Sequence, residues 1–390
     1  MERLQAVRPI YLDFNATTPI DPRVAKAMQP FLSEHFGNPS SSHAYGVEAR
    51  QAVEKARGQV ADMLGCSMGE VVFTSGGTES NNLAIKGAAF ALRDRGNHII
   101  TSAVEHPAVL EVCAWLAQQG FQVTYVGVDD YGQVDPQDVE RALTPQTALI
   151  SIMHANNEVG TIQPISEVAQ IAHSHNIVMH TDAAQSIAKI AVNIKELGVD
   201  MLSVAGHKLY APKGVGALVI RKGTPLEKMM HGAGHEFGLR AGTENVAGIA
   251  GLGEACRQAA NHLKDYQGNM RAKRDRLESL LLDNFPWIRV NGHREQRLPN
   301  TSSLGFQGLE ANTLLAACAN VAASAGAACH AGDVKVSHVL QAMRVPPDYA
   351  MGTIRFSVGR ETRAEEIEQA VDSFSGVIRQ MRTGTGAADE

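Results

Sequence analysis

The sequence predicts an α/β protein with a large domain, built on a mostly parallel central sheet covered by helices, and a smaller α+β C-terminal domain. Between about residues 71 and 220, short apolar runs rich in β-branched residues alternate with stretches of helical periodicity. The runs are apolar throughout, as expected for strands that are buried on both faces. With 390 residues, the chain is also long enough to bury a large core and form two domains.

The individual elements of the large domain follow from this alternation. A helix comes first, because an apolar stripe at helical spacing ends at Gly65; the stripe consists of Val53, Ala56, Val60, Met63 and Leu64. The runs that predict strands are Val71–Phe73, Ile99–Thr101, Val123–Val126, Ala148–Ile152, Ile177–Met179, Met201–Val204 and Ala217–Ile220.

The C-terminal part shows a second pattern. Its predicted elements are a long polar helix over residues 254–284, strands over 302–306 and 353–357, and a last helix from Thr362 to about Met381. We therefore expect a large domain over residues 16–260 and a small domain over 261–390, joined by the N-terminal segment 1–15.

Composition excludes several classes of protein. The net charge is −6 with no block of like charge, which argues against nucleic acid or an anionic membrane as the main partner. The N-terminus has no apolar signal segment, and the longest uncharged run, residues 311–329, is broken by polar residues and is a poor membrane span. Five cysteines without a CxxC pair favour neither a disulfide framework nor a zinc site, so we expect a reducing, cytoplasmic setting.

Asp182 and Lys208 are the most informative pair of residues. Each follows a predicted buried strand, and 26 positions separate them. Pyridoxal phosphate needs such a pair, because a lysine amine forms a Schiff base with its aldehyde and a carboxylate keeps its ring nitrogen protonated. Taken alone, the pair fits a helix-capping aspartate and a surface lysine equally well.

A glycine-rich turn precedes a predicted helix at residues 74–82. Gly76 and Gly77 allow an anion to approach the backbone N–H groups at the helix start, and the Thr78 hydroxyl adds a donor. The turn lacks the lysine of a mononucleotide-binding loop and the spacing of a dinucleotide-binding one. A plain strand-to-helix turn is the alternative interpretation.

Further polar residues follow other predicted strands. His106 could stack on a planar cofactor, and the amides of Asn157 and Gln185 could contact a phenolic oxygen, although each residue could also serve a turn. All lie just beyond the carboxyl ends of strands, where open α/β sheets bind ligands. If these residues served separate turns, there would be no reason for all of them to lie at the same edge of the sheet.

Two residues and one loop outside this grouping are candidates for substrate or cofactor contacts. Arg355 lies in an apolar strand, and its fork-shaped cation suits a carboxylate. Cys329 lies in a run of small residues over 322–332, which suits a mobile loop with an accessible, nucleophilic thiol. The polar loop 240–245 is either another phosphate contact or a plain surface loop.

Together these residues resemble the class V, fold-type I pyridoxal-phosphate enzymes, and more narrowly the NifS/IscS cysteine desulfurases and the related selenocysteine lyases. The most specific motifs lie at residues 75–82, 181–185 and 206–208, and the match extends from residue 11 to residue 360. The resemblance implies the fold of the pyridoxal-phosphate-dependent transferases of type I.

The resemblance also implies a role for each site residue. Those that would contact the cofactor are Gly77, Thr78, His106, Asn157, Asp182, Gln185, His207, Lys208 and Thr243. In this scheme Lys208 is the Schiff-base lysine and acid/base, Asp182 pairs with the pyridine nitrogen, and His106 stacks on the ring. Asn157 and Gln185 would contact the O3′ oxygen, while Gly77, Thr78 and His207 would hold the phosphate.

The remaining implied roles concern the substrate and the partner subunit. Thr243 would reach the phosphate of the neighbouring subunit, which implies a homodimer with shared sites. Arg355, together with Asn38, would bind the substrate carboxylate. Cys329 would attack the substrate sulfur and become a persulfide.

The leading hypothesis is therefore a cysteine desulfurase that converts L-cysteine to L-alanine and supplies sulfur for Fe–S cluster assembly or thiolation, through an acceptor such as an Fe–S scaffold protein. Two departures from the desulfurase pattern, Ala205 in place of serine and the sequence Ala-Ala-Cys-His over 327–330, are closer to selenocysteine lyases, the alternative. A non-catalytic interaction module on the same fold predicts loss of Lys208 or Asp182, and both are present. Cys329 argues against an aminotransferase.

Overall fold

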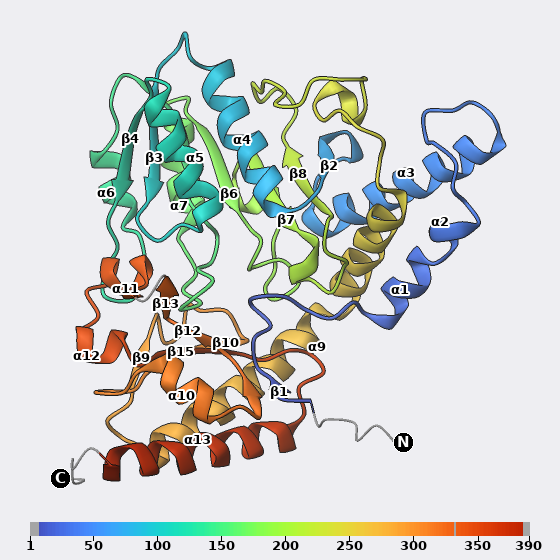
Figure 1. The fold of residues 1–390 in the computed structure, drawn as a ribbon. Helices are drawn as coiled ribbons and strands as arrows, with labels where there is room; N and C mark the ends of the chain where they lie inside the picture. The colour runs from blue at the N-terminus through green and yellow to red at the C-terminus, as the bar shows by residue number, and fades with distance from the viewer. Residues whose placement is uncertain (1–7, 331–332, 385–390) are drawn as a thin grey trace.

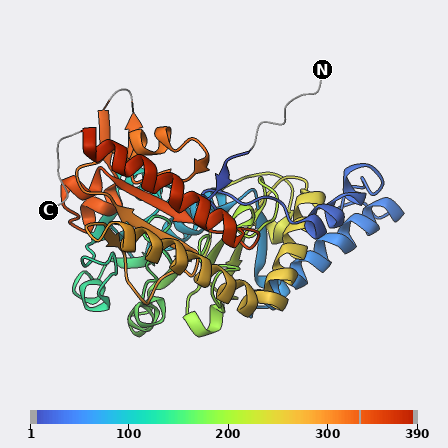
Figure 2. The ribbon, with the colours of Figure 1, turned by 90° about the horizontal axis from the view of Figure 1, so that it is seen from below.

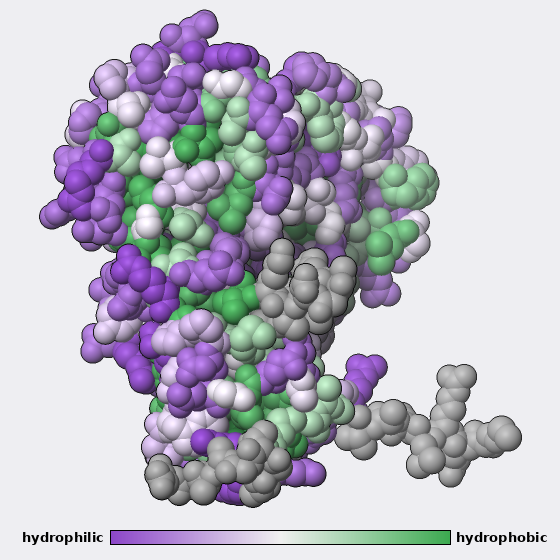
Figure 3. Space-filling view, turned by 60° about the vertical axis from the view of Figure 1, so that its left-hand side comes forward, coloured by the Kyte–Doolittle hydropathy of each residue, from purple (hydrophilic) through white to green (hydrophobic). Residues whose placement is uncertain are grey.

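The computed structural model describes residues 8–330 and 333–384, with the backbone alone for 327–330, 333–335 and 383–384. Figure 1 shows a larger α/β part, to which the middle of the chain contributes its sheet, above a smaller part formed mainly by the C-terminal third. No described helix is long and apolar enough to cross a membrane. Hydrophilic side chains predominate on the upper part of the face drawn in Figure 3.

The central sheet has seven strands in the order β2-β8-β7-β6-β5-β3-β4. The strands are β2 (Val71–Thr74), β3 (His98–Ser102), β4 (Gln122–Val126), β5 (Thr147–Ser151), β6 (Val178–Asp182), β7 (Met201–Ala205) and β8 (Gly216–Ile220). All neighbours pair in parallel except β8, which is antiparallel to both β2 and β7. The prediction of a mostly parallel sheet with strands at these seven runs is confirmed.

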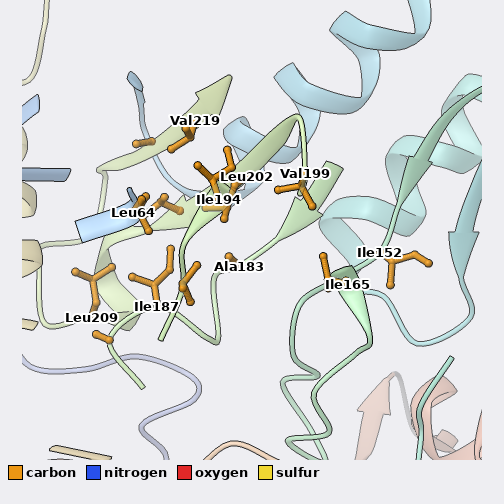
Figure 4. Close-up of a cluster of buried hydrophobic side chains, with 14 of the residues drawn as sticks. Leu64, Ile152, Ile165, Ala183, Ile187, Ile194, Val199, Leu202, Leu209 and Val219 are labelled. Carbon is orange, nitrogen blue, oxygen red and sulfur yellow. The ribbon is translucent and has the colours of Figure 1, made fainter. Parts of the chain in front are cut away.

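Helices cover both faces of this sheet, which is why its strands are apolar on both sides. Neighbouring strand residues alternate between two buried clusters: Ile99 and Leu149 belong to one, Ile100 and Ile150 to the other. Figure 4 shows part of the second cluster. The helices of this part are α3 (Ala44–Leu64), α4 (Gly77–Ala91), α5 (Pro107–Gln118), α6 (Pro136–Arg141), α7 (Ile165–Ser174) and α8 (Ile194–Leu197), after α1 (Pro22–Met28) and α2 (Pro30–Ser33).

The predicted stop of the first long helix is confirmed. Gly65 follows α3 with a left-handed backbone, at φ 70°, and its N–H bonds to the carbonyl of Ala61. Glycine adopts this conformation without the steric cost that a side chain would add.

The small part is built on a four-stranded antiparallel sheet in the order β12-β15-β10-β9. Its elements are β9 (Arg289–Asn291), β10 (Thr301–Gly305), α10 (Ala311–Ala317), β11 (Val321–Ala322), β12 (Ser324–Ala325), α11 (His338–Ala342), α12 (Pro347–Ala350), β15 (Thr353–Ser357) and α13 (Ala364–Gly384). It has a core of its own, which includes Phe306, Phe356 and Phe374. In Figure 2, seen from below, α13 lies across this part.

One long helix, α9 (Val246–Asn284), connects the two parts. Its first half, around Ile249 to Ala259, packs in the core of the large part, and Met270 to Leu281 pack in that of the small part. The helix begins eight residues before the predicted start at 254, because its small N-terminal residues carry little periodic signal. A domain boundary at 260/261 inside α9, where the buried residues change core, stays our proposal.

Two further strand pairs belong to the small part, one expected and one unexpected. Strand β1 (Ile10–Tyr11) pairs in parallel with β11, which attaches the N-terminal segment to this part. The segment expected to be a loop around Cys329 instead forms a hairpin, in which β13 (Ala327–His330) pairs with β14 (Asp333–Val336). The small residues of β13 leave no apolar pattern in the sequence, and the polar–apolar alternation of β14 spans only four residues, too few for a firm prediction.

Candidate active site

A cavity of about 400 Å³ lies at the carboxyl ends of the central strands. Its lining residues come from loops after β2, β3, β5, β6 and β7, which all run in the same direction, and from the small part. Of the predicted site residues, those that line it are Gly77, Thr78, His106, Asn157, Asp182, Gln185, His207, Lys208 and Arg355. The cavity therefore unites the groups that the sequence placed at strand ends.

Asp182, the last residue of β6, brings a buried carboxylate to the cavity. Its Oδ1 accepts from the Ala184 N–H at 2.9 Å, and its Oδ2 accepts from Asn81 Nδ2 at 2.7 Å. The Asn81 Oδ1 atom is buried without a hydrogen-bond partner. Since buried polar atoms are nearly always paired, this oxygen and the held carboxylate indicate that a polar ligand completes the site.

Lys208 lies in a short helical turn, η2 (Gly206–Lys208), directly after β7. Its Nζ donates to the carbonyl of Ala16 at 2.8 Å and to that of Asn15. Burial, with help from the Arg355 cation, lowers the pKa of this amine from 10.5 to about 8. An amine that releases its proton near neutral pH can attack an aldehyde, which fits a Schiff-base lysine.

The end of the cavity that fits a phosphate is formed by the start of α4. Residues Gly77 and Thr78 open this helix, whose first N–H groups are free of intrahelical partners. A Cβ atom on Gly77 would come within 3.2 Å of the Ala205 Cβ, so glycine keeps this wall open. Ala205 itself lines the cavity, and it therefore removes a hydroxyl from the site in relation to the desulfurase pattern.

The two cavity histidines are held in different ways. His106 caps α5, where its Nδ1 accepts from the Ala108 N–H at 3.1 Å, so the proton of the neutral ring lies on Nε2. Burial lowers its pKa, which favours this neutral form. His207 lies within hydrogen-bond distance of the Thr17 hydroxyl, and burial lowers its pKa to about 4. Both rings are neutral at pH 7.

Arg355 reaches the cavity from β15 of the small part. Its Nη1 donates to the carbonyl of Asn157 at 2.9 Å, and its Nη2 donates to Asp13 Oδ1 at 2.8 Å and to Ser324 Oγ at 2.9 Å. Its Nε is buried without a partner. A carboxylate at this wall would supply the missing acceptor.

Three predicted residues are not brought into the cavity of this chain. Asn38 is exposed, and its Oδ1 accepts from the Ser40 N–H. Thr243 is also exposed, on the loop before α9. Cys329 lies in β13, where its backbone pairs with Val334, but its side chain is outside the described part of the molecule.

Sequence reasoning missed three residues of this site. Asn15 and Asn81 line the cavity, and Lys189 lies behind it with its Nζ 2.7 Å from Gln185 Oε1. The first two belong to recognised motifs but had no assigned role. Lys189 did carry a signal, because an isolated lysine in the otherwise apolar run 187–190 is unusual for an exposed turn.

These residues fit pyridoxal phosphate. The volume lies within the range of small-molecule sites. The wall offers an amine, a carboxylate, an unpaired amide oxygen and a helix N-terminus, which match an aldehyde, a protonated ring nitrogen and a phosphate. In the described ranges 8–330 and 333–384, no cluster of three or more His, Cys, Asp or Glu side chains could hold a metal ion.

Comparisons with known proteins agree with this chemistry. The family model described as aminotransferase class-V matches residues 10–370. The chain is 48% identical to a protein named cysteine desulfurase IscS from Dictyoglomus turgidum, over 96% of each chain. It is 47% identical to a cysteine desulfurase from Gluconacetobacter diazotrophicus, over 96% of this chain and 94% of the relative.

Solved structures give the same result for the fold. A structure named NifS-like protein superposes with a TM-score of 0.90 at 39% identity, and the match covers 95% of this chain and 100% of the other. A structure described as SspA in complex with cysteine matches with a TM-score of 0.80 at 38% identity, over 90% of this chain and 99% of the other.

Proposed function

Because this chain belongs to the class-V aminotransferase family and to its IscS- and NifS-like cysteine desulfurases, we propose a role for each cavity residue in the conversion of L-cysteine to L-alanine. The protein is a pyridoxal-phosphate-dependent cysteine desulfurase. The observation that carries the proposed roles is that one cavity unites the Lys208 amine, the Asp182 carboxylate and the start of α4.

The bound cofactor supplies an aldehyde that joins to amines and a ring that withdraws electrons from the substrate. Lys208 holds the cofactor through its amine and, once released, moves the proton from the substrate α-carbon, which its lowered pKa of about 8 permits. Asp182, whose two oxygens are held in place by Asn81 and Ala184, would pair with the protonated ring nitrogen. His106 would stack on the ring in its neutral form.

The other contacts orient the two molecules. Gly77, Thr78 and His207 hold the phosphate, while Asn157 and Gln185 contact the phenolic O3′ oxygen. Arg355 binds the substrate carboxylate, to which its unpaired Nε can donate. Asn38 is the second proposed contact of this carboxylate, and in this chain it lies exposed outside the cavity.

Cys329 receives the sulfur. Its thiolate attacks the substrate sulfur, so an S–S bond forms while the bond from sulfur to the β-carbon breaks. The electron pair of the broken bond stays on the β-carbon, which takes a proton and becomes the methyl group of alanine. The product on the protein is a persulfide, ready for a sulfur-acceptor protein such as an Fe–S scaffold.

The protein acts as a homodimer in a reducing compartment such as the cytoplasm. Exposed apolar side chains support a partner surface: Phe237 and Met230 lie on the loop that leads to Thr243, with 58% and 38% exposure. Such large exposed apolar groups are typical of interfaces when they cluster. The cysteines whose side chains are described, Cys66, Cys113, Cys256 and Cys318, are free thiols, which supports the reducing setting.

Release of alanine from L-cysteine and from L-selenocysteine tests the proposal. Wild type is expected to act on L-cysteine and to show a visible absorbance band that disappears in Lys208→Ala. Cys329→Ala should keep the band but form no persulfide. A colourless protein that pyridoxal phosphate cannot restore would refute the assignment. Activity on L-selenocysteine alone would instead identify a selenocysteine lyase, the alternative that Ala205 favours.

A further inference from the structure

Lys189 is a buried amine that the reaction scheme does not use, and burial, with the nearby Lys208 and Arg355 charges, lowers its pKa well below 10.5. Its side chain is only 4% exposed, yet none of the ion pairs in the described part of the chain includes it. Its Nζ donates to two neutral oxygens, Gln185 Oε1 at 2.7 Å and Asn15 Oδ1 at 2.8 Å. Burial of a lysine amine is costly, so these two contacts require an explanation.

The backbone beside Lys189 adds a second observation. Ala188 has a φ of 66°, in the left-handed region that residues with a Cβ atom rarely adopt. Such conformations persist where the surrounding structure imposes them, and they gather near functional sites. The turn that carries Lys189 is thus held in a strained form that places its amine behind the cavity.

Lys189 determines which way the Gln185 amide faces. With Oε1 engaged by the lysine, the Gln185 Nε2 donates to the Asn15 carbonyl at 3.0 Å. Rotation of the amide by 180° would remove the acceptor of the Lys189 amine and set the Gln185 oxygen against the Asn15 carbonyl, so one hydrogen bond would be lost and the other contact would become repulsive. Since Gln185 lines the cavity, its second N–H remains for a ligand.

Asn15 is locked by the same contacts. Its Oδ1 accepts from Lys189 and from Asn300 Nδ2 at 3.0 Å, and its Nδ2 donates to Thr301 Oγ1 at 2.8 Å. Its carbonyl, which accepts from Gln185, therefore has a fixed position. The amide of Gln185 is held at both ends by groups that cannot themselves turn.

We propose that Lys189 is a positioning residue, which fixes the Gln185 amide with its NH2 group toward the cavity so that it donates to the phenolic oxygen of the cofactor. The inference rests on the proposed function, in which Gln185 contacts this oxygen. An amide free to rotate would present its oxygen to an anionic oxygen part of the time, and the contact would then be repulsive.

The test uses the cofactor-free protein and pyridoxine 5′-phosphate, which keeps the phenolic oxygen but lacks the aldehyde. Binding then does not depend on Lys208 or on turnover. Lys189→Met keeps the length of the side chain and removes its donors. We expect it to bind pyridoxine 5′-phosphate about tenfold more weakly than wild type, the usual size of one lost hydrogen bond to a charged group.

A double-mutant cycle separates positioning from general support of the fold. In the Gln185→Ala background, Lys189→Met should change binding by less than about twofold, because the group it orients is absent. In the reconstituted enzyme, Lys189→Met should also move the pH midpoint of the visible absorbance band. Ala188→Gly, which relieves the strained backbone and leaves the contacts in place, is the matched control and should bind like wild type.

Three results would overturn the inference. Binding by Lys189→Met within twofold of wild type would show that the lysine orients nothing, and an equal loss in the Gln185→Ala background would show that it acts elsewhere. If Lys189→Met does not fold, as judged by circular dichroism, Lys189→Gln replaces it, because the glutamine amide keeps a donor. If Lys189→Gln binds pyridoxine 5′-phosphate as weakly as Gln185→Ala does, the proposal is contradicted; tighter binding by Lys189→Gln than by Gln185→Ala would support it. If wild type itself fails to bind pyridoxine 5′-phosphate, the proposed function fails first.

Discussion

The amine of Lys208 should titrate far below other lysines in the cofactor-free protein. Burial and the Arg355 cation lower its pKa to about 8, against 10.5 for an ordinary lysine. This difference corresponds to about 3 kcal/mol by which the surroundings favour the neutral amine. At pH 8 about half of the Lys208 amines are then free, about 150-fold more than for a lysine with the ordinary pKa.

Acylation of the cofactor-free protein over a range of pH measures this directly. A trace of acetic anhydride reacts with free amines, and peptide mass spectrometry gives the extent of modification at each lysine, so exposed lysines serve as internal references. The Lys208 midpoint is expected near pH 8, and Arg355→Met should raise it, because the second cause of the lowered pKa is removed. A Lys208 midpoint near 10.5, or one that Arg355→Met leaves unchanged, would refute the reasoning.

Three further predictions follow from other contacts. Asp182→Asn keeps the size of the side chain but not its charge, so alanine release should fall at least about a hundredfold; a wild-type rate would contradict pairing with the ring nitrogen. Arg57→Met breaks a buried ion pair in which Nη1 and Nη2 each lie 2.8 Å from a carboxylate oxygen of Glu236. Urea unfolding should show that the free energy of unfolding falls by about 3–5 kcal/mol. Arg141→Met, at an exposed ion pair, should lower it by less than about 1 kcal/mol. Burial raises the pKa of Glu105 to about 8, above its unfolded value, so its contribution to stability is complete below about pH 4.5 and is lost as pH rises through 8. Glu105→Gln should therefore make the free energy of unfolding measurably less dependent on pH across that window. An unchanged pH profile would exclude this residue as the source.

The sequence predicts the sheet better than the rest of the fold. The seven strands lie within a few residues of their apolar runs, because strands buried on both faces are mostly apolar, with a few buried polar residues such as His180 and Ser203. The chain around Cys329 has a weaker signal: Gly332-Asp333 is a turn-type pair and residues 333–336 alternate polar and apolar, but the small residues of 327–330 do not indicate a strand. Helix α9 likewise extends beyond its periodic stretch, since Gly248 and Gly251 near its start pack closely without adding apolar signal.

The site residues show the same difference between local and long-range signals in the sequence. Asp182 and His106 are identifiable because their position at the end of a strand is a local property of the sequence. Asn15 reaches Gln185 only through folding, across 170 positions of the chain, whereas Lys189 is a local neighbour four positions from Gln185. Their roles depend on hydrogen-bond direction in three dimensions, which residue type and spacing do not specify.

Arg355 and Cys329, to which we assign substrate binding and sulfur acceptance, are connected through neighbouring strands of the small part. Arg355 in β15 pairs with Ser324 in β12, and its Nη2 donates to the Ser324 hydroxyl. Beyond β12, Gly326 bonds to the carbonyl of Thr353 at 2.7 Å and accepts from the Ser337 N–H at 3.0 Å, which closes the base of the hairpin. Cys329 lies five residues after Ser324, a span of at most about 17 Å of extended chain. In the proposed function Arg355 binds the substrate carboxylate and Cys329 receives the sulfur, so the residues that serve the two ends of the substrate would be attached to the same pair of strands, β12 and β15.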